Sequence, residues 1–557
     1  MSSRAAACSA FLSALLLASC RAPSPLSVPA LRLDGADVVK RVVTTSSPEA
    51  QAWFNQGLTL LYGFNHGEAI RSFHQATLAD PNCAMAWWGL AAASAVDLND
   101  DSMTRGDYHR GWDAAARAIE ASASATPVEQ ALARAVAARF AWPPPFDRRR
   151  LDEAYAAAME RVHAEFPDDP DVATNYADAL MLLQPWDYWT PSGEPKGRVL
   201  EAIRALEHAL AVAPDHAGAC HFLIHATEAG QPKRGERAAD ALAGRVPGSG
   251  HLLHMPSHIY VHLGRYADAA DVNEAAIATD HRYFQEAKEP GSVWGYYAHN
   301  VHMLAYSAMM EGREELAMQA GRELERELPE AVIQSNLPWF DGLMATSLHV
   351  MVRFGRFEEI LQEPEPPPYR LLSRAERHYA RGVALAALGR PAEARVEQTR
   401  FLEVAAEVPE DWNVGANPSK EVLGLARQML EGEIAWREGK VEQAFSAMRE
   451  GARLEDLMVY DEPPGWMQPV RHAFGALLVA AGRHAEAEEV YREDLRRNPG
   501  NGWSLLGLEQ ALSAQGRAEE ASAVAEELAG VWRRADARPL SSCYCEPGAT
   551  SLTTAPQ

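Results

Sequence analysis

Histidines are concentrated in one stretch of this chain. Nine of its 19 histidines lie in the 82 residues from 221 to 302, where an even spread over 557 residues would place about three. Seven of the nine occur in the segments HFLIH, HLLHMPSHIY and HNVH, where they are three or four residues apart. This spacing puts side chains on one face of a helix. Imidazole is the commonest protein ligand of transition metals, so the stretch predicts a metal site if these faces converge.

A repeated pattern of small residues and proline indicates the helices that must position these histidines. In residues 50–83, the residues at repeat positions 4, 8, 20, 24, 27 and 32 are Trp53, Gly57, Ala69, Phe73, Ala76 and Pro81. This is the tetratricopeptide pattern, a hairpin of two helices in about 34 residues. Small residues at positions 8 and 20 let the two helices approach closely, and the proline ends the second helix.

The same register recurs along the chain. A turn glycine is followed five residues later by a small or aliphatic residue at Gly264/Ala269, Gly312/Ala317, Gly355/Ile360, Gly389/Ala394, Gly439/Ala444, Gly482/Ala487 and Gly516/Ala521. The length and this period predict an all-α, right-handed α-solenoid of about 11–12 hairpins. We expect almost no β-strand.

Four segments point to a particular group of repeat proteins. They are FNHGEAIRSFHQA, PNCAMAWWG, HMPSHIYVHLGRYADA and YREDLRRNPGNGWSLLGL. Over roughly residues 48–530 the chain resembles a group of bacterial tetratricopeptide-repeat (TPR) lipoproteins. The resemblance implies a solenoid that binds a protein or peptide in its concave groove. It also implies that this groove is lined by positions 2, 5, 9, 12 and 13 of each first helix.

The repeat register directs the histidines to that groove. Three successive hairpins place groove-facing residues at His221 and His225, at His251, His254 and His258, and at His299 and His302. Packed helices lie about 8–10 Å apart, so imidazoles from neighbouring hairpins can share one ion. Glu228 lies on the same face as His221 and is a candidate carboxylate ligand or base. We expect His254 and His258 to lie at the centre of the site.

The identity of the metal stays open, because nitrogen-rich sites suit zinc, copper, iron and nickel alike. The sequence has no HExxH, CxxC, phosphate-binding glycine loop or GxSxG motif, so the familiar hydrolase and nucleotide-binding motifs are absent. Two functions follow as alternatives. The first is a membrane-anchored solenoid that binds a protein partner and holds a metal. The second is a metal-dependent enzyme, redox or hydrolytic, with its active site in the groove.

The first residues resemble an export signal. Arg4 precedes an apolar run that includes FLSALLLA, and Leu17-Ala18-Ser19-Cys20 resembles a bacterial lipobox. We therefore expect lipidation at Cys20 and an exported bacterial lipoprotein at the outer membrane or the periplasmic face of the envelope. No later run of 18 apolar residues occurs, so the lipid is the only membrane anchor that the sequence predicts.

The net charge limits the class of partner, whereas the cysteine content leaves the disulfide state open. The formal net charge is −24 and no long basic run occurs, which argues against nucleic-acid binding. The sequence does not determine whether the four cysteines outside the signal region form disulfides. They are Cys83, Cys220, Cys543 and Cys545.

These observations predict five segments. They are a lipoprotein signal peptide over residues 1–19, a Pro/Ser-rich tether over 20–47, an N-terminal TPR array with the histidine site over 48–330, a C-terminal TPR array over 331–535, and a disordered tail over 536–557.

Overall fold

The computed structural model describes residues 25–543. Its chain divides into two compact units, with a boundary near residue 300 instead of the predicted 330. The first unit comprises residues up to 259 together with 272–300, and the second comprises 260–271 together with 301 onward. The signal peptide, Cys20 and Cys545 lie outside the described residues. Cys83 and Cys220 are free and buried.

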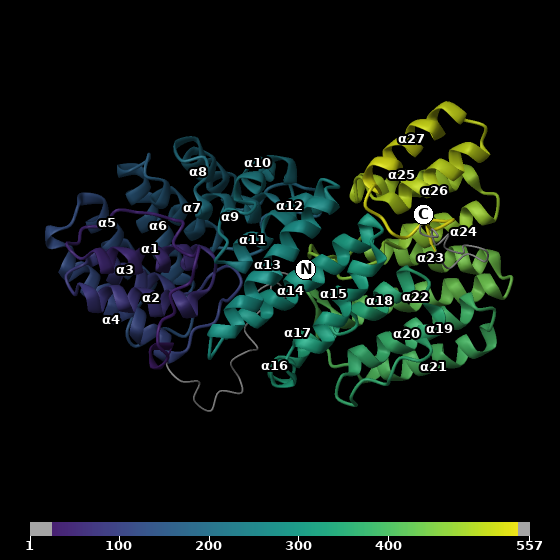
Figure 1. Ribbon diagram of the computed structural model, residues 1–557, viewed down its shortest axis with the longest axis horizontal. Helices are drawn as coiled ribbons and strands as arrows, with labels where there is room; N and C mark the ends of the chain where they lie inside the picture. Colours follow the sequence, from purple (N-terminus) through teal and green to yellow (C-terminus); the bar gives the residue numbers. More distant parts are fainter. Residues whose placement is uncertain (1–24, 544–557) are drawn as a thin grey trace. The chain divides into compact units, whose positions relative to one another are not determined.

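The helices of the first part of the chain follow one another as pairs (Figure 1). Their bounds are α1 Pro48–Tyr62, α2 His66–Ala79, α3 Ala84–Ala93, α4 Arg105–Ala121, α5 Pro127–Val136, α6 Arg149–Glu165, α7 Pro170–Met181, α8 Val199–Val212, α9 Ala217–Thr227, α10 Pro232–Leu242, α11 Gly250–His254, α12 Pro256–His262, α13 Tyr266–Glu286 and α14 Val293–Glu311. Short 3₁₀ helices occur at Pro25–Ser27, Ser122–Ser124 and Ala137–Arg139.

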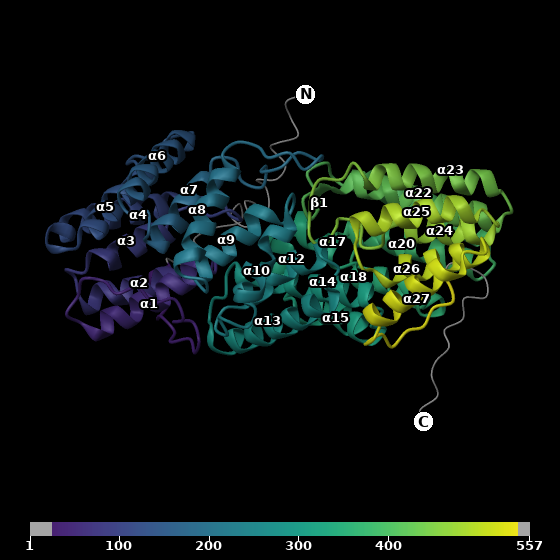
Figure 2. The ribbon, with the colours of Figure 1, turned by 90° about the horizontal axis from the view of Figure 1, so that it is seen from above.

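The later helices continue the same pairing. Their bounds are α15 Glu314–Glu327, α16 Glu330–Ser335, α17 Leu337–Leu343, α18 Thr346–Arg353, α19 Phe357–Ile360, α20 Leu371–Ala387, α21 Pro391–Glu407, α22 Ser419–Arg437, α23 Val441–Glu455, α24 Val470–Ala480, α25 His484–Arg497, α26 Gly502–Ala514 and α27 Ala518–Val531. From α20 to α27 each hairpin packs beside the next (Figure 2).

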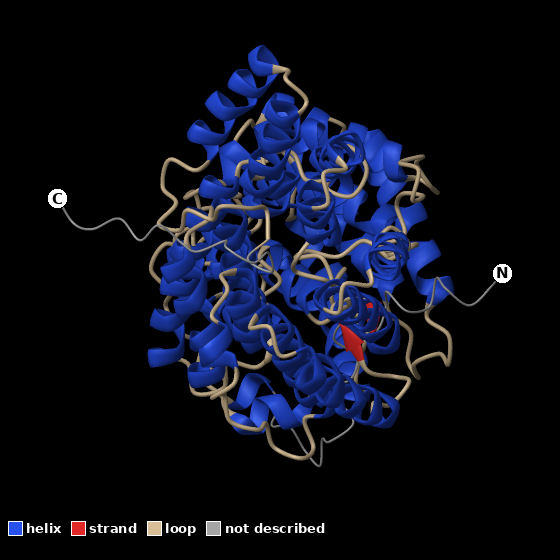
Figure 3. Ribbon diagram, turned by 90° about the vertical axis from the view of Figure 1, so that its right-hand side faces the viewer, coloured by secondary structure: helices blue, strands red, loops and turns tan. Residues whose placement is uncertain are grey.

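Within residues 25–543 the only strands are β1 (Asn413–Val414) and β2 (Asn417–Pro418), which pair antiparallel (Figure 3). Twelve helical pairs can be followed along the described chain: α1/α2, α3/α4, α5/α6, α7/α8, α9/α10, α11–α12/α13, α14/α15, α18/α19, α20/α21, α22/α23, α24/α25 and α26/α27. The predicted fold class, an all-α solenoid of TPR-like hairpins, is confirmed. Over the same residues, no helix is long and apolar enough to cross a membrane.

Aromatic rings packed on glycines hold neighbouring hairpins together. In the first unit, the Phe73 ring lies so close to Gly57 and Gly89 that a Cβ on either would approach it to 2.8 or 2.3 Å. The predicted small residue at position 8 therefore does contact the aromatic residue at position 24. The α1/α2 hairpin thus needs a glycine both in its own first helix and in α3.

The predicted tether is too long at its C-terminal end. Within the first unit, the Val39 amide donates to Thr59 Oγ1, and Arg41 donates to Asp169 and Asp171. Val39 and Val43 are buried. The spaced apolar side chains and the arginine therefore bind this segment to the helices.

The predicted disordered tail also begins too early. In the second unit, the Ala537 amide donates to the Gly312 carbonyl, and the buried Ser542 hydroxyl donates to the His472 carbonyl. Residues 536–543 therefore pack on the second array.

Candidate metal centre

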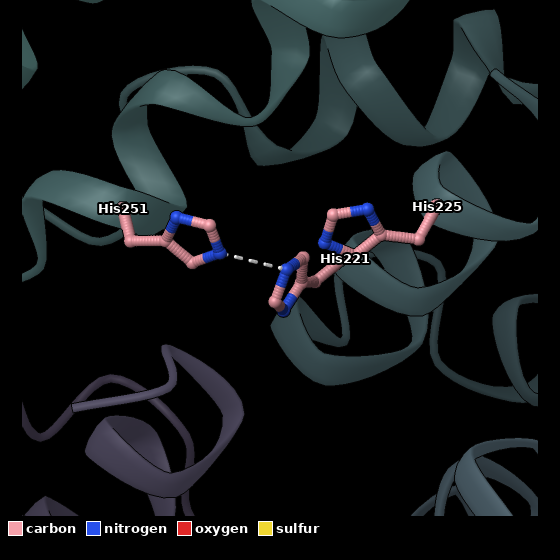
Figure 4. A group of neighbouring side chains, drawn as sticks. All are labelled: His221, His225 and His251. Atoms are coloured by element: carbon pink, nitrogen blue, oxygen red, sulfur yellow. Dashed lines mark hydrogen bonds between the residues drawn. The ribbon is translucent and has the colours of Figure 1, made fainter. Parts of the chain in front are cut away.

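Three of the predicted histidines form a first triad, which we define as His221, His225 and His251. His221 and His225 lie one turn apart on α9, and His251 reaches them from α11 (Figure 4). The His221 and His251 Nε2 atoms are 3.1 Å apart. One nitrogen from each of the three rings lies within 4.8 Å of the others. The three side chains are 0–6% exposed.

Oxygen atoms next to Nδ1 determine the tautomers of His221 and His225. His221 Nδ1 lies 2.6 Å from the Tyr62 carbonyl oxygen. An oxygen that only accepts requires Nδ1 to carry the proton, so His221 Nε2 keeps its lone pair. His225 Nδ1 lies 3.2 Å from Glu228 Oε1, and its buried Nε2 has no hydrogen-bond partner. Both rings therefore present an Nε2 lone pair to the centre of the triad.

Burial keeps the rings of His221 and His251 neutral. The pKa values of His221 and His251 lie well below the usual histidine range, first because burial penalises the imidazolium ion and then because neighbouring histidines repel a second charge. A neutral imidazole is the form that ligates metals, so protons do not compete strongly for these nitrogens.

The second triad consists of His254, His258 and His299. Pro256 follows the end of α11 at His254, and because proline lacks an N–H the helix is interrupted before α12. His254 and His258 therefore lie on either side of this break, and their Nε2 atoms are 2.7 Å apart. His299, from α14, places its Nε2 3.4 Å from that of His258. The His299 side chain is partly exposed and the other two are buried.

The short distance in the second triad is chemically informative. His254 Nδ1 lies 2.7 Å from Asn273 Oδ1, and His258 Nδ1 lies 3.0 Å from Glu228 Oε2. The Asn273 oxygen requires the His254 proton on Nδ1, which leaves His254 Nε2 with a lone pair. The contact between His258 Nδ1 and Glu228 Oε2 lacks hydrogen-bond geometry, so His258 can donate from Nε2 to His254 Nε2. One nitrogen from each of the three rings lies within 4.8 Å of the others, so the second triad could hold a metal ion.

Glu228 belongs to both triads at once. Its side chain is fully buried, and its two oxygens lie against Nδ1 of His225 and Nδ1 of His258. The sequence suggested Glu228 as a ligand or base. Within the first unit its carboxylate lies behind the rings, in a hydrogen bond with His225 Nδ1 and 3.0 Å from His258 Nδ1. A carboxylate behind the ring is typical of metal-bound histidine.

Two aromatic residues that enclose the first triad have strained backbones. Phe64 has a φ of 54° and Trp186 a φ of 62°, and in residues 25–543 they are the only non-glycine residues with positive φ. The Phe64 ring stacks on His225 and His251, and the Trp186 ring meets His225 edge-on. Strain of about 1–3 kcal/mol per residue persists only where surrounding contacts impose it.

The structure brings six of the seven predicted histidines into the two triads. The triads adjoin, because the ring centroids of His225 and His258 are 6.0 Å apart and those of His251 and His254 are 6.1 Å apart. His302 belongs to the second unit, where its Nε2 lies 3.3 Å from Met467 Sδ.

Sequence reasoning missed the residues that support the triads. Asn273 and the Tyr62 carbonyl gave no signal, because neither shares a helix face with the histidine it holds. Phe64 lies in the turn FNHG, where a non-glycine residue at positive φ is not evident from the sequence. Trp186 had a signal, since it is part of an aromatic-rich insert that interrupts the repeat period.

Comparison with known proteins agrees with this fold. A family model described as tetratricopeptide repeat matches residues 478–530. Cellulose synthase operon protein C of Xanthomonas axonopodis pv. citri (strain 306) is 33% identical over 165 residues, which is 28% of this chain. The match spans 10% of that protein's own length.

Two solved structures of human IFIT1 are also similar. The dimer with m7Gppp-AAAA has 13% sequence identity and a TM-score of 0.30, and the match covers 90% of this chain and 96% of that one. The dimer with PPP-AAAA has 12% identity and a TM-score of 0.28, with coverage of 86% and 90%.

The family assignment rests on the repeated hairpins and on the repeat model that matches within the second array. The chain contains a tetratricopeptide repeat over residues 478–530, within an array of similar helical hairpins.

Proposed function

We propose that this tetratricopeptide-repeat protein binds two transition-metal ions, one in each histidine triad. The observation that carries the proposal is the convergence of three imidazole nitrogens in each triad, all within 4.8 Å of one another. In the second triad the Nε2 atoms of His254 and His258 already lie 2.7 Å apart, so one ion could bind both. The first triad supports the same conclusion, because His221 and His225 also present deprotonated Nε2 atoms.

The donor set favours zinc, copper, iron or nickel over magnesium or calcium. Six imidazoles form the two triads, whereas the hard cations prefer carboxylate, carbonyl and water oxygens. Glu228 contributes one negative charge that both sites share. That charge offsets part of the cost of burying cations among neutral rings.

Metal analysis of tag-free full-length protein tests the proposal. After reconstitution and removal of excess metal, we expect two ions per chain. The double variants H221A/H251A and H254A/H258A should each hold one. His208→Ala is the matched control, since His208 is an exposed histidine that pairs with Asp168. A protein that stays metal-free, with a proton shared by His254 and His258 instead, would overturn the proposal.

A metal-dependent enzyme is the second candidate function. Three protein ligands leave a tetrahedral ion with one open position, which is typical of catalytic sites. The partial exposure of His299 gives the second triad a route to solvent. Such an ion would act as a Lewis acid or activate a bound water.

Azide titration of the cobalt-substituted protein distinguishes the two candidates. An open position predicts a saturable change in the visible spectrum that H254A/H258A abolishes. A spectrum insensitive to azide would indicate a closed, structural site and would remove the enzyme candidate.

We further infer that the repeat array binds a protein or peptide in its groove and that a lipid on Cys20 tethers it to the bacterial envelope. Tetratricopeptide repeats generally serve protein–protein interaction, which supports the first part. The lipobox-like sequence supports the second. The net charge of −24 speaks against a nucleic-acid partner.

A further inference from the structure

We propose that the C-terminal segment, which we define as residues 537–543, is a built-in ligand of the groove in the second array and competes there with the array's partner. This inference rests on the proposed binding of a protein or peptide and uses none of the triad residues. The C-terminal segment and the groove that it enters both belong to the second unit.

A cavity in the second unit coincides with the concave groove of the repeats. Its lining residues come mainly from α18, α20, α22 and α24, which are the first helices of four successive hairpins. We count the small or aliphatic residue after each turn glycine as position 20. Tyr379, Met429 and His472 then lie at position 5, and Val383 and Glu433 lie at position 9. These are positions that the repeat pattern assigns to the groove.

The C-terminal segment follows this groove. Gln510, at position 9 of the α26/α27 hairpin, donates a 2.7 Å hydrogen bond to the Leu540 carbonyl. Two residues later, Ser542 Oγ donates to the His472 carbonyl at 2.8 Å. Cys543 then lines the cavity itself. The segment therefore passes from α26 across α24 and into the groove.

Ser542 shows what the groove recognises. Its side chain is 0% exposed. Its hydroxyl proton goes to the His472 carbonyl, so the Tyr491 hydroxyl, 2.6 Å away, donates to Ser542 Oγ. A small side chain with a hydroxyl group satisfies both contacts in this buried place. The groove thus fits an extended peptide with serine at the corresponding position.

The C-terminal segment is held by few apolar side chains. Ala537 and Pro539 are buried whereas Arg538 and Leu540 are exposed, which is the alternation of an extended peptide. The two buried apolar side chains are small and remove little apolar surface from water. Segments with few buried apolar contacts open at a low free-energy cost. A partner of the same chemistry can therefore displace the segment.

Its attachment to the chain makes the segment an effective competitor. A short flexible connection holds a ligand near its site at an effective concentration on the order of millimolar. A partner binds only those molecules whose groove is open, so its apparent affinity falls in proportion to their fraction. The segment thereby excludes partners that bind weakly.

The test measures binding of a fluorescent peptide, ARPLSSS, which is the C-terminal segment with Cys543→Ser. One protein is the full chain. The other ends at Asp536, which is kept because its carboxylate accepts hydrogen bonds from the Glu314 and Glu315 amides. Fluorescence anisotropy should show at least about tenfold tighter binding to the shortened chain, as expected when fewer than a tenth of the parent grooves are open.

A full-length variant repeats the test without shortening the chain. Ser542→Arg places a long charged side chain at a fully buried position, so the segment must leave the groove. The peptide should then bind as tightly as it binds the shortened chain. Leu540→Arg is the matched control, because Leu540 is 45% exposed, and it should bind the peptide as weakly as the parent.

Gln510→Ala in the shortened chain tests where the peptide binds. It removes the bond to the Leu540 carbonyl, so peptide affinity should fall about 2–10-fold. Gln515→Ala is its control, since Gln515 is exposed and bonds to Glu488 instead. Equal peptide affinity of the parent and the shortened chain would overturn the inference, and so would a Ser542→Arg protein that behaves like the parent.

A random heptapeptide display library, panned on the shortened chain, separates two kinds of failure. Enrichment of library peptides together with no binding of ARPLSSS would overturn the role of the C-terminal segment and leave the proposed peptide binding intact. A shortened chain that binds neither would contradict the proposed peptide binding as well.

Discussion

At the scale of single residues, the site is defined by what lies behind each imidazole ring. Tyr62, Asn273 and Glu228 each place an oxygen near an Nδ1 atom. Each oxygen fixes a tautomer and turns an Nε2 lone pair inward. Without such a partner, a histidine in either triad could adopt either tautomer. Metal affinity should therefore depend on these supporting residues nearly as much as on the ligands.

Glu228→Gln tests this dependence. The amide keeps the shape of the carboxylate but can accept from only one Nδ1–H, while its NH₂ group faces the other. One imidazole must then change tautomer or turn away. We expect metal affinity to fall about 10–100-fold, as is typical when a supporting group is lost.

Competition with a chelator of known affinity measures that change. Glu236→Gln is the control, since Glu236 pairs with Lys233 at the surface of α10. Parent-like affinity in Glu228→Gln would mean that Glu228 does not orient the ligands.

At the scale of elements, one packing device occurs in both arrays. Phe73 lies between Gly57 and Gly89, and Tyr491 lies in the same way between Gly475 and Gly507. In both cases the ring follows the first glycine by 16 residues and the second glycine follows the first by 32. The aromatic ring fills the space that two missing side chains leave. The spacing of the histidines in three dimensions depends on this close approach of helices.

Gly89→Ala should destabilise the protein even though alanine is the better helix former. The added Cβ would lie 2.3 Å from the Phe73 ring, so the hairpins must separate. Overpacking of this kind costs about 1–3 kcal/mol. Gly424→Ala is the opposite case, because nothing lies within 4 Å of its Cβ position in α22. It should stabilise by about 0.5–1 kcal/mol.

Chemical unfolding of both variants measures these free energies. Equal effects at Gly89 and Gly424 would show that helix propensity, and not contact with the Phe73 ring, determines the outcome.

A buried ion pair connects the N-terminal segment to the first triad. Asp171 pairs with Arg41 and accepts a 2.7 Å hydrogen bond from the hydroxyl of Tyr62, whose carbonyl holds His221. Burial alone would raise the pKa of Asp171, but contacts with His216, Arg41 and Tyr62 outweigh it and hold this pKa well below the usual range.

The stabilisation from Asp171 should therefore be present above about pH 4, the pKa of an unfolded aspartate, and should be lost as pH falls further. Asp171→Asn should lower the free energy of unfolding at pH 7 by about 3–5 kcal/mol, because it leaves Arg41 buried with less compensation. The difference between parent and variant should shrink below pH 4. A difference that is independent of pH would contradict this role for Asp171.

At the scale of the whole molecule, the repeat period was readable because small residues and turn glycines recur at fixed positions in many of the hairpins. That register also indicated which way the histidines face. Six of them do meet in the first unit, from three successive first-helix segments. The position of a residue in the repeat tells only which face of its own helix it occupies. It could therefore predict that His221, His254 and His299 face the same side of the array, but not the distances between them.

The remaining features depend on contacts between distant parts of the chain. The division near residue 300 separates His302 from the triads although it lies one turn from His299 on α14. Arg41 reaches Asp169 across 128 positions, so the composition of its segment suggested a tether that the structure does not have. The role of Glu228 required knowing which nitrogen of two different rings it approaches.

The lipid anchor remains a prediction, because Cys20 lies outside the described residues. Cys20→Ser removes the thiol that would carry the lipid. In a bacterial host that processes lipoproteins, we expect the variant to move from the membrane fraction to the soluble fraction. Cys8→Ser, a change within the apolar run, should leave the protein with the membranes. Unchanged fractionation of Cys20→Ser would show that the lipobox interpretation is wrong.

Metal binding should also stabilise the folded chain, since the unfolded chain cannot hold six imidazoles in two triads. An ion present at 100 times its dissociation constant adds about 2.7 kcal/mol to the free energy of unfolding. We therefore expect a chelator to lower the melting temperature of the reconstituted parent and to leave that of H221A/H251A/H254A/H258A unchanged. Calorimetry with and without chelator gives both values. His208→Ala should behave like the parent, because its exposed ring contributes to neither triad. Equal melting temperatures of the parent with and without chelator would mean that the triads hold no ion tightly enough to matter for folding.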